Sequence, residues 1–328
     1  MSLNYLFLFL FILTSLSADG QYTPFPVDNP AELGKVKWHR NYEEALKVSE
    51  DVRLPVFILF QEVPGCSNCT RFGKNVLSHP LIVEAIETYF VPLCIYNNNN
   101  GADQTVLKKY HEPAWNNPVI RIVDTNGKDI INREHDFNSR AKVIHAIKNA
   151  LTKSGNTVPE YLMLLLEEWD AVEKNVVEEA YLSMYCFWSG EKEIAGMDGI
   201  LSTEAGYMHG KEVVKVRFDT QKTNLDALVS KASKSGCADQ VYGNIQKNTK
   251  LTIRPVGTYK KDAEDKYYLQ KSAYMVIPMT DLQKAKVNRA LALGQNPDHF
   301  LSPRQLGILK NKKYSKSQVN SLIESVWW

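Results

Sequence analysis

The sequence predicts an α/β protein with two domains, each a sheet covered by helices. Short apolar runs, such as residues 55–60, alternate with amphipathic stretches in an order that places strands and helices in turn. The 328 residues, 44% of them hydrophobic, can bury a core, and this length favours two domains over one. A Cys-x-x-Cys pair, Cys66 and Cys69, follows the first apolar run and gives the N-terminal half a candidate site.

Charge and cysteine content narrow the function. The 39 basic residues nearly balance the 37 acidic ones, so nucleic acid is not an expected partner. There is no second Cys-x-x-Cys pair to complete a zinc site, and we expect neither a metal nor a cofactor. Thiol redox chemistry is the better interpretation of the five cysteines, which are Cys66, Cys69, Cys94, Cys186 and Cys237.

The N-terminus has the pattern of a secretory signal. An apolar run at residues 6–13 is followed by small residues, which predicts a signal peptide over residues 1–18. The run is shorter than the roughly 20 residues that span a bilayer, so an uncleaved anchor is the weaker alternative. We expect the protein in the secretory pathway, extracellular or in another extracytoplasmic compartment, with no stable membrane insertion after cleavage.

The first domain is predicted over residues 36–153, after an extended, proline-rich lead-in at 19–35. Asn41 and Glu44 indicate a helix start, and Pro80 opens another helix in its first turn. An Asn-Gly pair at 126–127, between two apolar runs, indicates a hairpin. In chain order we expect a helix at 42–50, a strand at 55–60, a helix after the dithiol, a helix at 80–90, a strand at 91–96, a helix at 103–110, hairpin strands at 119–123 and 129–131, and a helix at 138–151.

This order of elements resembles a thioredoxin-like domain, and Pro118 stands where that fold places a cis-proline facing the dithiol. The segment Val63-Pro64-Gly65-Cys66, with Thr70 after it, resembles thioredoxin-like selenoproteins that carry selenocysteine at the first redox position. Ordinary thioredoxins have Trp before the first cysteine and Gly-Pro between the two. Because this chain has neither, their reduction potential does not transfer to it.

The dithiol position favours a redox role. A thiolate at a helix N-terminus is stabilised by the helix dipole and by free backbone amides. Cys66 is therefore the expected attacking thiol, and Cys69, one turn later, the resolving thiol. A structural disulfide or half of a metal site are the alternatives.

A helical joint is predicted at residues 154–177, with its helix running over 159–178, and the second domain over 178–328. The apolar face of the joint helix, which includes Leu162 and Trp169, is expected to pack between the two halves. The second domain should contain a strand ending near Cys186, a helix to about 195, strands at 200–207 and 212–218, a helix at 224–234, and a helical C-terminal extension with runs at 262–274 and 280–293 and a further one after 302.

Three ordered segments of the second domain resemble the peptide methionine sulfoxide reductase A family. They are Cys186-Phe187-Trp188 with Glu191, residues 199–207 and residues 212–219. The resemblance implies a ferredoxin-like α/β fold and reduction of a sulfoxide by a thiolate while an acid protonates the oxygen. The roles it implies are Cys186 as nucleophile, Glu191 as proton donor, Cys237 as resolving thiol, Phe187 and Trp188 as walls of the substrate methyl site, and Tyr207 and Asp219 as polar groups around the sulfoxide oxygen.

The motif is not complete. Tyr185 and Ser189 replace glycines on either side of Cys-Phe-Trp, and the loop that normally follows Tyr207 is missing. A shortened site could take a different sulfoxide or lack the reaction.

Three hypotheses follow. The first is a secreted sulfoxide reductase with a fused thioredoxin-like electron donor, in which Cys66 and Cys69 reduce the oxidised Cys186. The second is a thiol-disulfide oxidoreductase whose C-terminal half only binds a client, and the third is a non-catalytic interaction protein. The first two require an oxidised peptide or protein substrate, carrying methionine sulfoxide or a disulfide, and an upstream thiol reductant.

Overall fold

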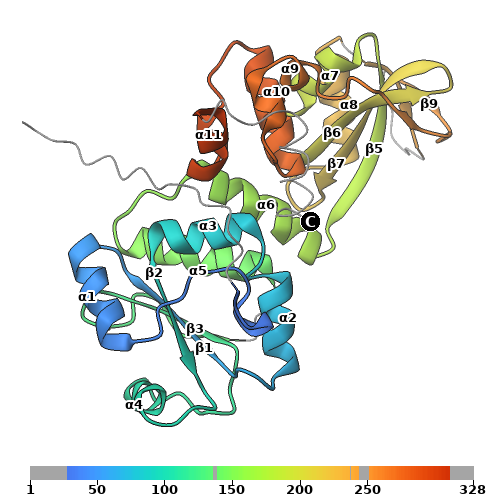
Figure 1. Ribbon diagram of the computed structural model, residues 1–328. Coiled ribbons are helices and arrows are strands. Elements are labelled where there is room, and N and C mark those ends of the chain that lie inside the picture. The colour runs from blue at the N-terminus through green and yellow to red at the C-terminus, as the bar shows by residue number, and fades with distance from the viewer. Residues whose placement is uncertain (1–27, 136–138, 237, 244–250, 311–328) are drawn as a thin grey trace, which may run out of the picture.

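The computed structural model describes residues 28–135, 139–236, 238–243 and 251–310. Two sheets, each with its own helices, form two domains, and helix α6 (Glu160–Glu173) lies between them (Figure 1). The predicted signal peptide and most of the predicted lead-in lie outside the described residues. No helix in the described part of the chain is long and apolar enough to cross a membrane.

The N-terminal domain has a four-stranded sheet in the order β2-β1-β3-β4, with β1 parallel to β2 and antiparallel to β3. This α/β arrangement confirms the predicted class. Its helices are η1 (Ala31–Leu33), α1 (Tyr42–Val52), α2 (Ser67–Asn75), α3 (Pro80–Tyr89), α4 (Ala102–Lys109) and α5 (Arg140–Lys153), and its strands are β1 (Val56–Gln61), β2 (Val91–Tyr96), β3 (Val119–Val123) and β4 (Glu134–His135).

Strand β1 is the centre of this domain because all six of its residues are buried. Phe57 and Leu59 belong to the core on one face of the sheet, whereas Ile58 and Phe60 belong to the core on the other. A continuous apolar run without alternation is what a strand covered on both faces requires. The dithiol follows the end of this strand and is therefore held by the most buried element of the domain.

Two predictions for this domain are wrong. Residues 31–33 form a 3₁₀ turn rather than an extended lead-in, and Leu33 joins the core. Residues 129–131 form no strand: Asp129 makes a single bridge to Val123, and Ile131 turns into the core. The strand that pairs with β3 is β4, a few residues later.

The C-terminal domain has a six-stranded sheet in the order β10-β6-β7-β5-β8-β9. The elements β5-α7-β6-β7-α8-β8 form a split β-α-β repeat, and their four strands are antiparallel neighbours. This confirms the predicted ferredoxin-like order. The strands are β5 (Val177–Met184), β6 (Ile200–Met208), β7 (Lys211–Asp219), β8 (Ala238–Tyr242), β9 (Thr252–Arg254) and β10 (Lys260–Lys261), and the helices are α7 (Phe187–Ile194), α8 (Leu225–Lys234), α9 (Tyr267–Gln270), η2 (Ala273–Val276), α10 (Asp281–Ala292), η3 (Asp298–Phe300) and α11 (Pro303–Lys310).

Helix lengths differ from the prediction where single residues adopt positive φ. Helix α6 ends at Glu173 rather than 178 because Asn175, with φ 54°, is left-handed. The predicted helix at 262–274 is broken into α9 and η2, and Lys266, with φ 60°, precedes α9. Strands β8, β9 and β10 were not predicted; β9 and β10 are short and join the sheet only at its edges.

Carboxylates of the N-terminal half cap helices of the C-terminal extension. Glu84 of α3, which is buried, accepts hydrogen bonds from Ser302 Oγ (2.5 Å) and from the backbone N–H of Arg304 (2.6 Å) at the start of α11. Glu168 of α6 accepts from the backbone N–H of Leu282 (3.3 Å) at the start of α10. These bonds place carboxylates at helix N-termini, where the helix dipole favours them.

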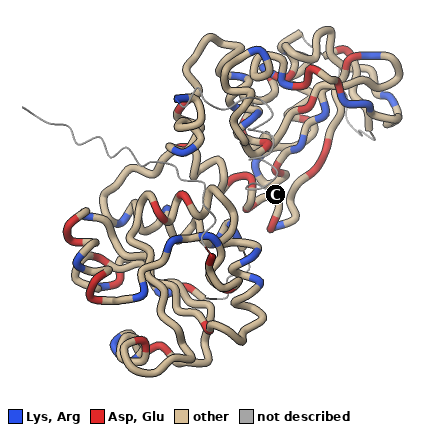
Figure 2. The backbone as a smooth tube through the Cα atoms, in the orientation of Figure 1, with Lys and Arg blue, Asp and Glu red and all other residues tan. Residues whose placement is uncertain are grey.

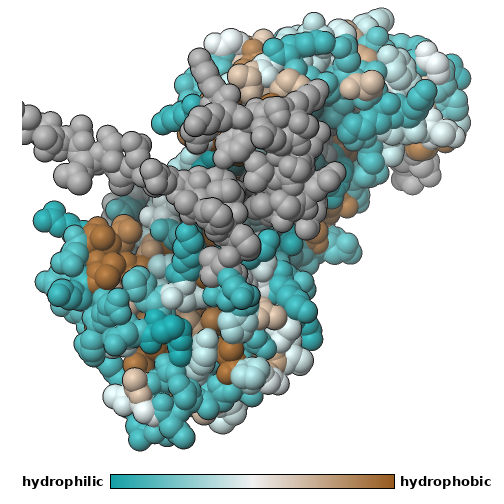
Figure 3. Space-filling model, in the orientation of Figure 1, coloured by the Kyte–Doolittle hydropathy of each residue, from teal (hydrophilic) through white to brown (hydrophobic). Residues whose placement is uncertain are grey.

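The visible surface carries no large region of one charge. Basic and acidic residues are interspersed over both domains (Figure 2), and the face shown in Figure 3 is mainly hydrophilic with scattered hydrophobic patches. The site must therefore be identified from local chemistry.

Candidate functional site

Cys66 occupies the N-cap of α2, as predicted. Its Sγ accepts a hydrogen bond from the backbone N–H of Cys69 at 3.2 Å, and its side chain is half-buried. A half-exposed cysteine at the first turn of a helix is a common position for a nucleophilic thiol. The geometry supports Cys66 as the thiol that attacks.

Cys69 differs from Cys66 because it is fully buried. Burial and the hydrogen bond with Cys66 raise the pKa of Cys69 well above its usual range. Its Sγ–H donates to Oδ1 of Asn117 at 3.0 Å, and the Asn117–Pro118 peptide bond is cis. Pro118 therefore lies in the loop that contacts the dithiol, and the raised pKa and the hydrogen bond to Asn117 favour the protonated thiol of Cys69.

The loop before Cys66 is fixed by one side chain. Asn98 accepts from the backbone N–H of Val63 (3.3 Å) and donates to the carbonyl oxygens of Val63 and Pro64 (3.2 Å each). Trp115, on the loop that leads to Pro118, is 82% exposed and leaves an aromatic surface available on the same loop. Asn98 and Trp115 were not identified from the sequence, because nothing local to them signals the dithiol.

The unequal burial of the thiols predicts selective alkylation. In the reduced native protein at pH 8, we expect iodoacetamide to label Cys66 and Cys186, which are half-exposed, and to label Cys69 and Cys94 at least about tenfold more slowly. Burial raises the pKa of both slow thiols, so the protonated, unreactive form persists to higher pH. Peptide mass spectrometry measures the rates, and labelling in denaturant is the control. Equal alkylation rates for all four cysteines in the native protein would contradict the burial of Cys69 and Cys94.

Cys186, the second cysteine for which the sequence predicts a redox role, has a similar local position. Cys186 is the N-cap of α7 and follows β5 directly, and its side chain is half-buried. Its carbonyl oxygen accepts from the backbone N–H of Gly190 at 3.0 Å. The sequence prediction that a strand delivers this cysteine to a helix start is confirmed.

A carboxylate that the sequence prediction missed lies beside Cys186. Glu212, at the start of β7, accepts from the backbone N–H of Phe187 at 2.8 Å, and Tyr207 is its cross-strand partner on β6. Burial, Asp262 and Glu212 together raise the pKa of Tyr207. The sequence offered one signal for Glu212: it is the first residue of the Glu-Val-Val segment that resembles the reductase family. Glu212 is thus a candidate acid next to the thiol.

Aromatic rings form a continuous series along this site. Tyr207 packs edge-on against Phe187 (5.4 Å between ring centroids), Phe187 contacts Trp188 (5.5 Å), and Trp188 stacks on Tyr267 (4.1 Å). Tyr268 meets Tyr267 edge-on at 5.4 Å. Phe187, Trp188 and Tyr207 are therefore brought together as predicted, but one face of Trp188 is covered by Tyr267 from a distant part of the chain.

Glu191 does not have the environment predicted for a proton donor. It is fully buried, and its Oε1 accepts from Lys266 Nζ (2.5 Å) and Thr203 Oγ1 (3.1 Å). Burial raises the pKa of Glu191 and the nearby charge of Asp265 adds to the rise, whereas the charge of Lys266 and the hydrogen bonds from Lys266 and Thr203 oppose it. Burial by itself lowers the pKa of Lys266. The negative charges of Glu191 and Asp265 have the larger effect, so the pKa of Lys266 is raised. Lys266 and Glu191 thus form a buried ion pair.

Lys266→Met should therefore be strongly destabilising. Removing one partner leaves the Glu191 carboxylate buried without its counter-ion, which costs about 3–5 kcal/mol of unfolding free energy. Urea denaturation measures the loss, and adding Glu191→Gln should recover part of it. Lys261→Met is the matched control: its side chain is 55% exposed, and its ion pairs are worth less than about 1 kcal/mol. Equal losses in both variants would refute the role assigned to Lys266.

Two other predicted site residues, Asp219 and Cys237, remain to be placed relative to Cys186. Asp219 ends β7 opposite Val177 at the start of β5, the far end of the sheet from Cys186, and its carboxylate accepts from the backbone N–H of Gln221 (2.8 Å). The prediction that it surrounds a sulfoxide oxygen is wrong because β7 runs antiparallel to β5. Cys237 lies outside the described residues.

The two redox cysteines are not near each other. The C-terminal end of α2 lies toward α6: the carbonyl oxygen of Asn75 accepts a hydrogen bond from Arg140, and Arg140 lies over the ring of Trp169 of α6. Cys66 is at the opposite end of α2, about 13 Å from Asn75 along the helix. In the other domain, β5 begins shortly after α6, and Cys186 lies past the opposite end of this eight-residue strand, about 26 Å from its first residue. Figure 1 likewise shows α2 in one domain and α7 at the far end of the other. Disulfide exchange needs sulfurs about 2 Å apart, so this arrangement does not join them.

Among the described residues, no group of three or more His, Cys, Asp and Glu side chains is arranged to hold a metal ion. The four described cysteines are all free thiols. An N-cap thiol, a buried partner thiol and a cis-proline loop at the end of a buried central strand define a thiol redox domain.

Comparison with known proteins agrees with this class. Residues 37–125 match the family model described as Thioredoxin-like, so this part of the chain is a thioredoxin-like domain. Solved structures with some similarity include a DsbH oxidoreductase (18% identical, covering 38% of this chain and 91% of that one, TM-score 0.32) and a thioredoxin from Thermus thermophilus (22% identical, 37% and 90%, TM-score 0.32).

The chain also has a partial relative that matches a shorter stretch of it. A peptide methionine sulfoxide reductase from Methanococcus maripaludis (strain C7 / ATCC BAA-1331) is 36% identical over 69 residues, which cover 16% of this chain. The chain spans only 44% of the length of that relative.

Proposed function

We propose that this chain is a thiol-dependent oxidoreductase of the secretory pathway that reduces methionine sulfoxide in peptides at Cys186 and exchanges disulfides at Cys66 and Cys69. The observation that carries the proposal is the shared placement of the two thiols. Cys66 and Cys186 each follow a strand, stand at the N-cap of a helix and remain half-exposed. This is the setting in which a cysteine acts as a nucleophile.

At Cys186 the reaction balances as follows. The thiolate attacks the sulfoxide sulfur while the sulfoxide oxygen takes up one proton. The S–O bond of the substrate then breaks as the hydroxyl passes to the sulfur of Cys186, which releases the thioether and leaves a sulfenic acid on Cys186. A second thiol then condenses with the sulfenic acid, which forms a disulfide and releases water. Glu212 is the better candidate for the acid because the hydrogen bond from Phe187 places its carboxyl next to Cys186, whereas Glu191 is engaged by Lys266.

At the first domain, Cys66 attacks a disulfide and forms a mixed disulfide with its substrate. Cys69 then loses its proton, attacks Cys66 and releases the reduced substrate, which leaves Cys66 and Cys69 oxidised. Because Cys66 and Cys186 are far apart, the electrons for Cys186 come from a separate thiol or from the dithiol of another molecule. An upstream thiol reductant restores the dithiol.

A second candidate is a thiol-disulfide oxidoreductase whose C-terminal domain binds a client without catalysis. The stacking of Tyr267 on Trp188 and the Glu191–Lys266 ion pair favour it, since both occupy groups that a sulfoxide site would use. Turnover of a methionine sulfoxide peptide with dithiothreitol as reductant separates the two. Turnover by residues 19–328 supports the first, and its absence together with intact disulfide exchange supports the second.

A secretory location requires its own test. Expression of the full chain in a secreting cell should yield protein whose N-terminal sequence begins near residue 19. Retention of residue 1 in a cytosolic product would refute the location without affecting the redox chemistry.

A further inference from the structure

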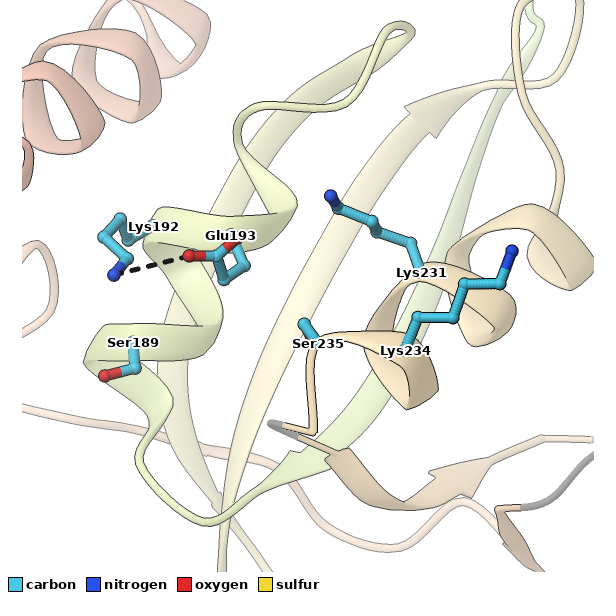
Figure 4. Close-up of a pocket in the computed structure, with 6 residues that line it drawn as sticks. All are labelled: Ser189, Lys192, Glu193, Lys231, Lys234 and Ser235. Atoms are coloured by element: carbon cyan, nitrogen blue, oxygen red, sulfur yellow. Dashed lines mark ion pairs between the residues drawn. The ribbon is translucent and has the colours of Figure 1, made fainter.

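A hollow between α7 and α8 has no role in the chemistry described above. It encloses a volume of about 520 Å³, within the range of small ligand sites. Figure 4 shows its walls: residues from α7 on one side and residues from the end of α8 on the other. The lining residues are Ser189, Lys192, Glu193, Lys231, Lys234 and Ser235.

The hollow is positively charged. Three lysines and one carboxylate line it, and that carboxylate, on Glu193, is paired with Lys192 at 3.3 Å. Lys231 and Lys234 form no ion pair with any residue in the described part of the chain, and Lys231 extends toward α7 in Figure 4. The excess charge is therefore available to an anionic ligand.

Helix stability does not account for the whole arrangement. Lysines in the last turn of α8 complement the helix dipole, which is reason enough for Lys231 and Lys234 to occur there. It gives no reason for Lys192, which comes from another helix, or for the hydroxyl of Ser189 to line the same hollow.

The position of the hollow suggests its occupant. Ser189 is three residues after Cys186, so it lies one helical turn from the thiol on the same side of α7. Exposed aromatic residues also flank Cys186: Tyr185 is 75% exposed and Tyr207 40% exposed. A peptide is long enough to contact these rings while one of its acidic side chains enters the hollow. A small free anion in the hollow would not contact the rings.

We propose that this hollow binds a carboxylate side chain of an acidic peptide and so seats a protein client beside Cys186. The carboxylate accepts a hydrogen bond from Lys231, the charge of Lys234 at the rim of the hollow adds to the attraction, and the peptide backbone runs toward the N-terminus of α7. This binding requires no reaction at Cys186, so it stands or falls separately from sulfoxide reduction.

The test uses residues 19–328 carrying Cys186→Ser and a fluorescein-labelled peptide with three Glu residues, measured by fluorescence anisotropy at low salt. We expect the Glu peptide to bind at least about tenfold more tightly than the same peptide with Gln, and Lys231→Glu/Lys234→Glu to remove that difference. Lys47→Glu/Lys108→Glu is the matched control, with the same charge change at two exposed lysines of the other domain, and should bind the Glu peptide normally.

Three results would overturn the proposal: equal binding of the Glu and Gln peptides, unchanged binding by the Lys231/Lys234 variant, or equal loss in the control variant. Competition with inorganic phosphate tests whether the hollow binds a small anion rather than an acidic peptide. Displacement of the peptide by phosphate beyond the effect of chloride at equal ionic strength would assign the hollow to a small anion instead, and its failure to do so supports a peptide.

Discussion

Cys66→Ser should abolish reduction of a protein disulfide, with a loss of at least about 10³-fold in rate, because serine is a far weaker nucleophile than a thiolate. The measurement is insulin reduction with dithiothreitol as electron source. Cys69→Ser should behave differently. Cys66 still attacks, but nothing resolves the product, so a mixed disulfide with the substrate accumulates and is visible on a non-reducing gel.

Cys94→Ala is the matched control for both variants. Cys94 is a fully buried thiol on β2, the strand beside β1, and no redox step uses it. We expect the control to retain activity while it is folded. Activity that survives in Cys66→Ser, or a mixed disulfide that also forms without Cys66, would show that the dithiol is not the reacting group.

At the second site, Cys186→Ser should eliminate methionine sulfoxide reduction, and Glu212→Gln should lower kcat by about 10²–10⁴-fold, the usual contribution of a general acid. The assay follows a sulfoxide peptide with dithiothreitol. The physical reason is proximity: Glu212 is bonded to the residue next to Cys186, and glutamine keeps that acceptor but cannot supply a proton.

Asp219→Asn separates this assignment from the one the sequence suggested. Because Asp219 lies at the opposite end of β7, we expect kcat within about twofold of the parent value. A large loss in Asp219→Asn with none in Glu212→Gln would reverse the assignment. Each cysteine variant reports on its own reaction, so failure at Cys186 leaves the disulfide exchange of the first domain intact.

The sequence was most informative where function and fold depend on neighbouring residues. The buried run at 55–60 predicted β1, and the Cys-x-x-Cys pair after it predicted an N-cap thiol at Cys66. Asn41 and Pro80 likewise marked helix starts that the structure contains. Such signals lie within a few residues of the element they specify, and local backbone chemistry fixes them.

The same sequence could not show which distant side chains complete each site. Lys266 reaches Glu191 from 75 residues away, and Tyr267 stacks on Trp188 from the same segment. The predicted helix at 262–274 fails there because burial of Lys266 against two carboxylates outweighs local helical preference, and the chain adopts a left-handed residue instead.

The amino-acid sequence by itself thus determined the two α/β domains, the dithiol at Cys66 and Cys69, and the position of Cys186 at a helix start. Tertiary structure alone decided that Glu212 rather than Asp219 lies beside Cys186, and that Cys66 and Cys186 stand far apart. The reason is that periodicity and capping describe contacts along the chain, whereas strand direction, sheet order and domain packing set which ends of the elements meet.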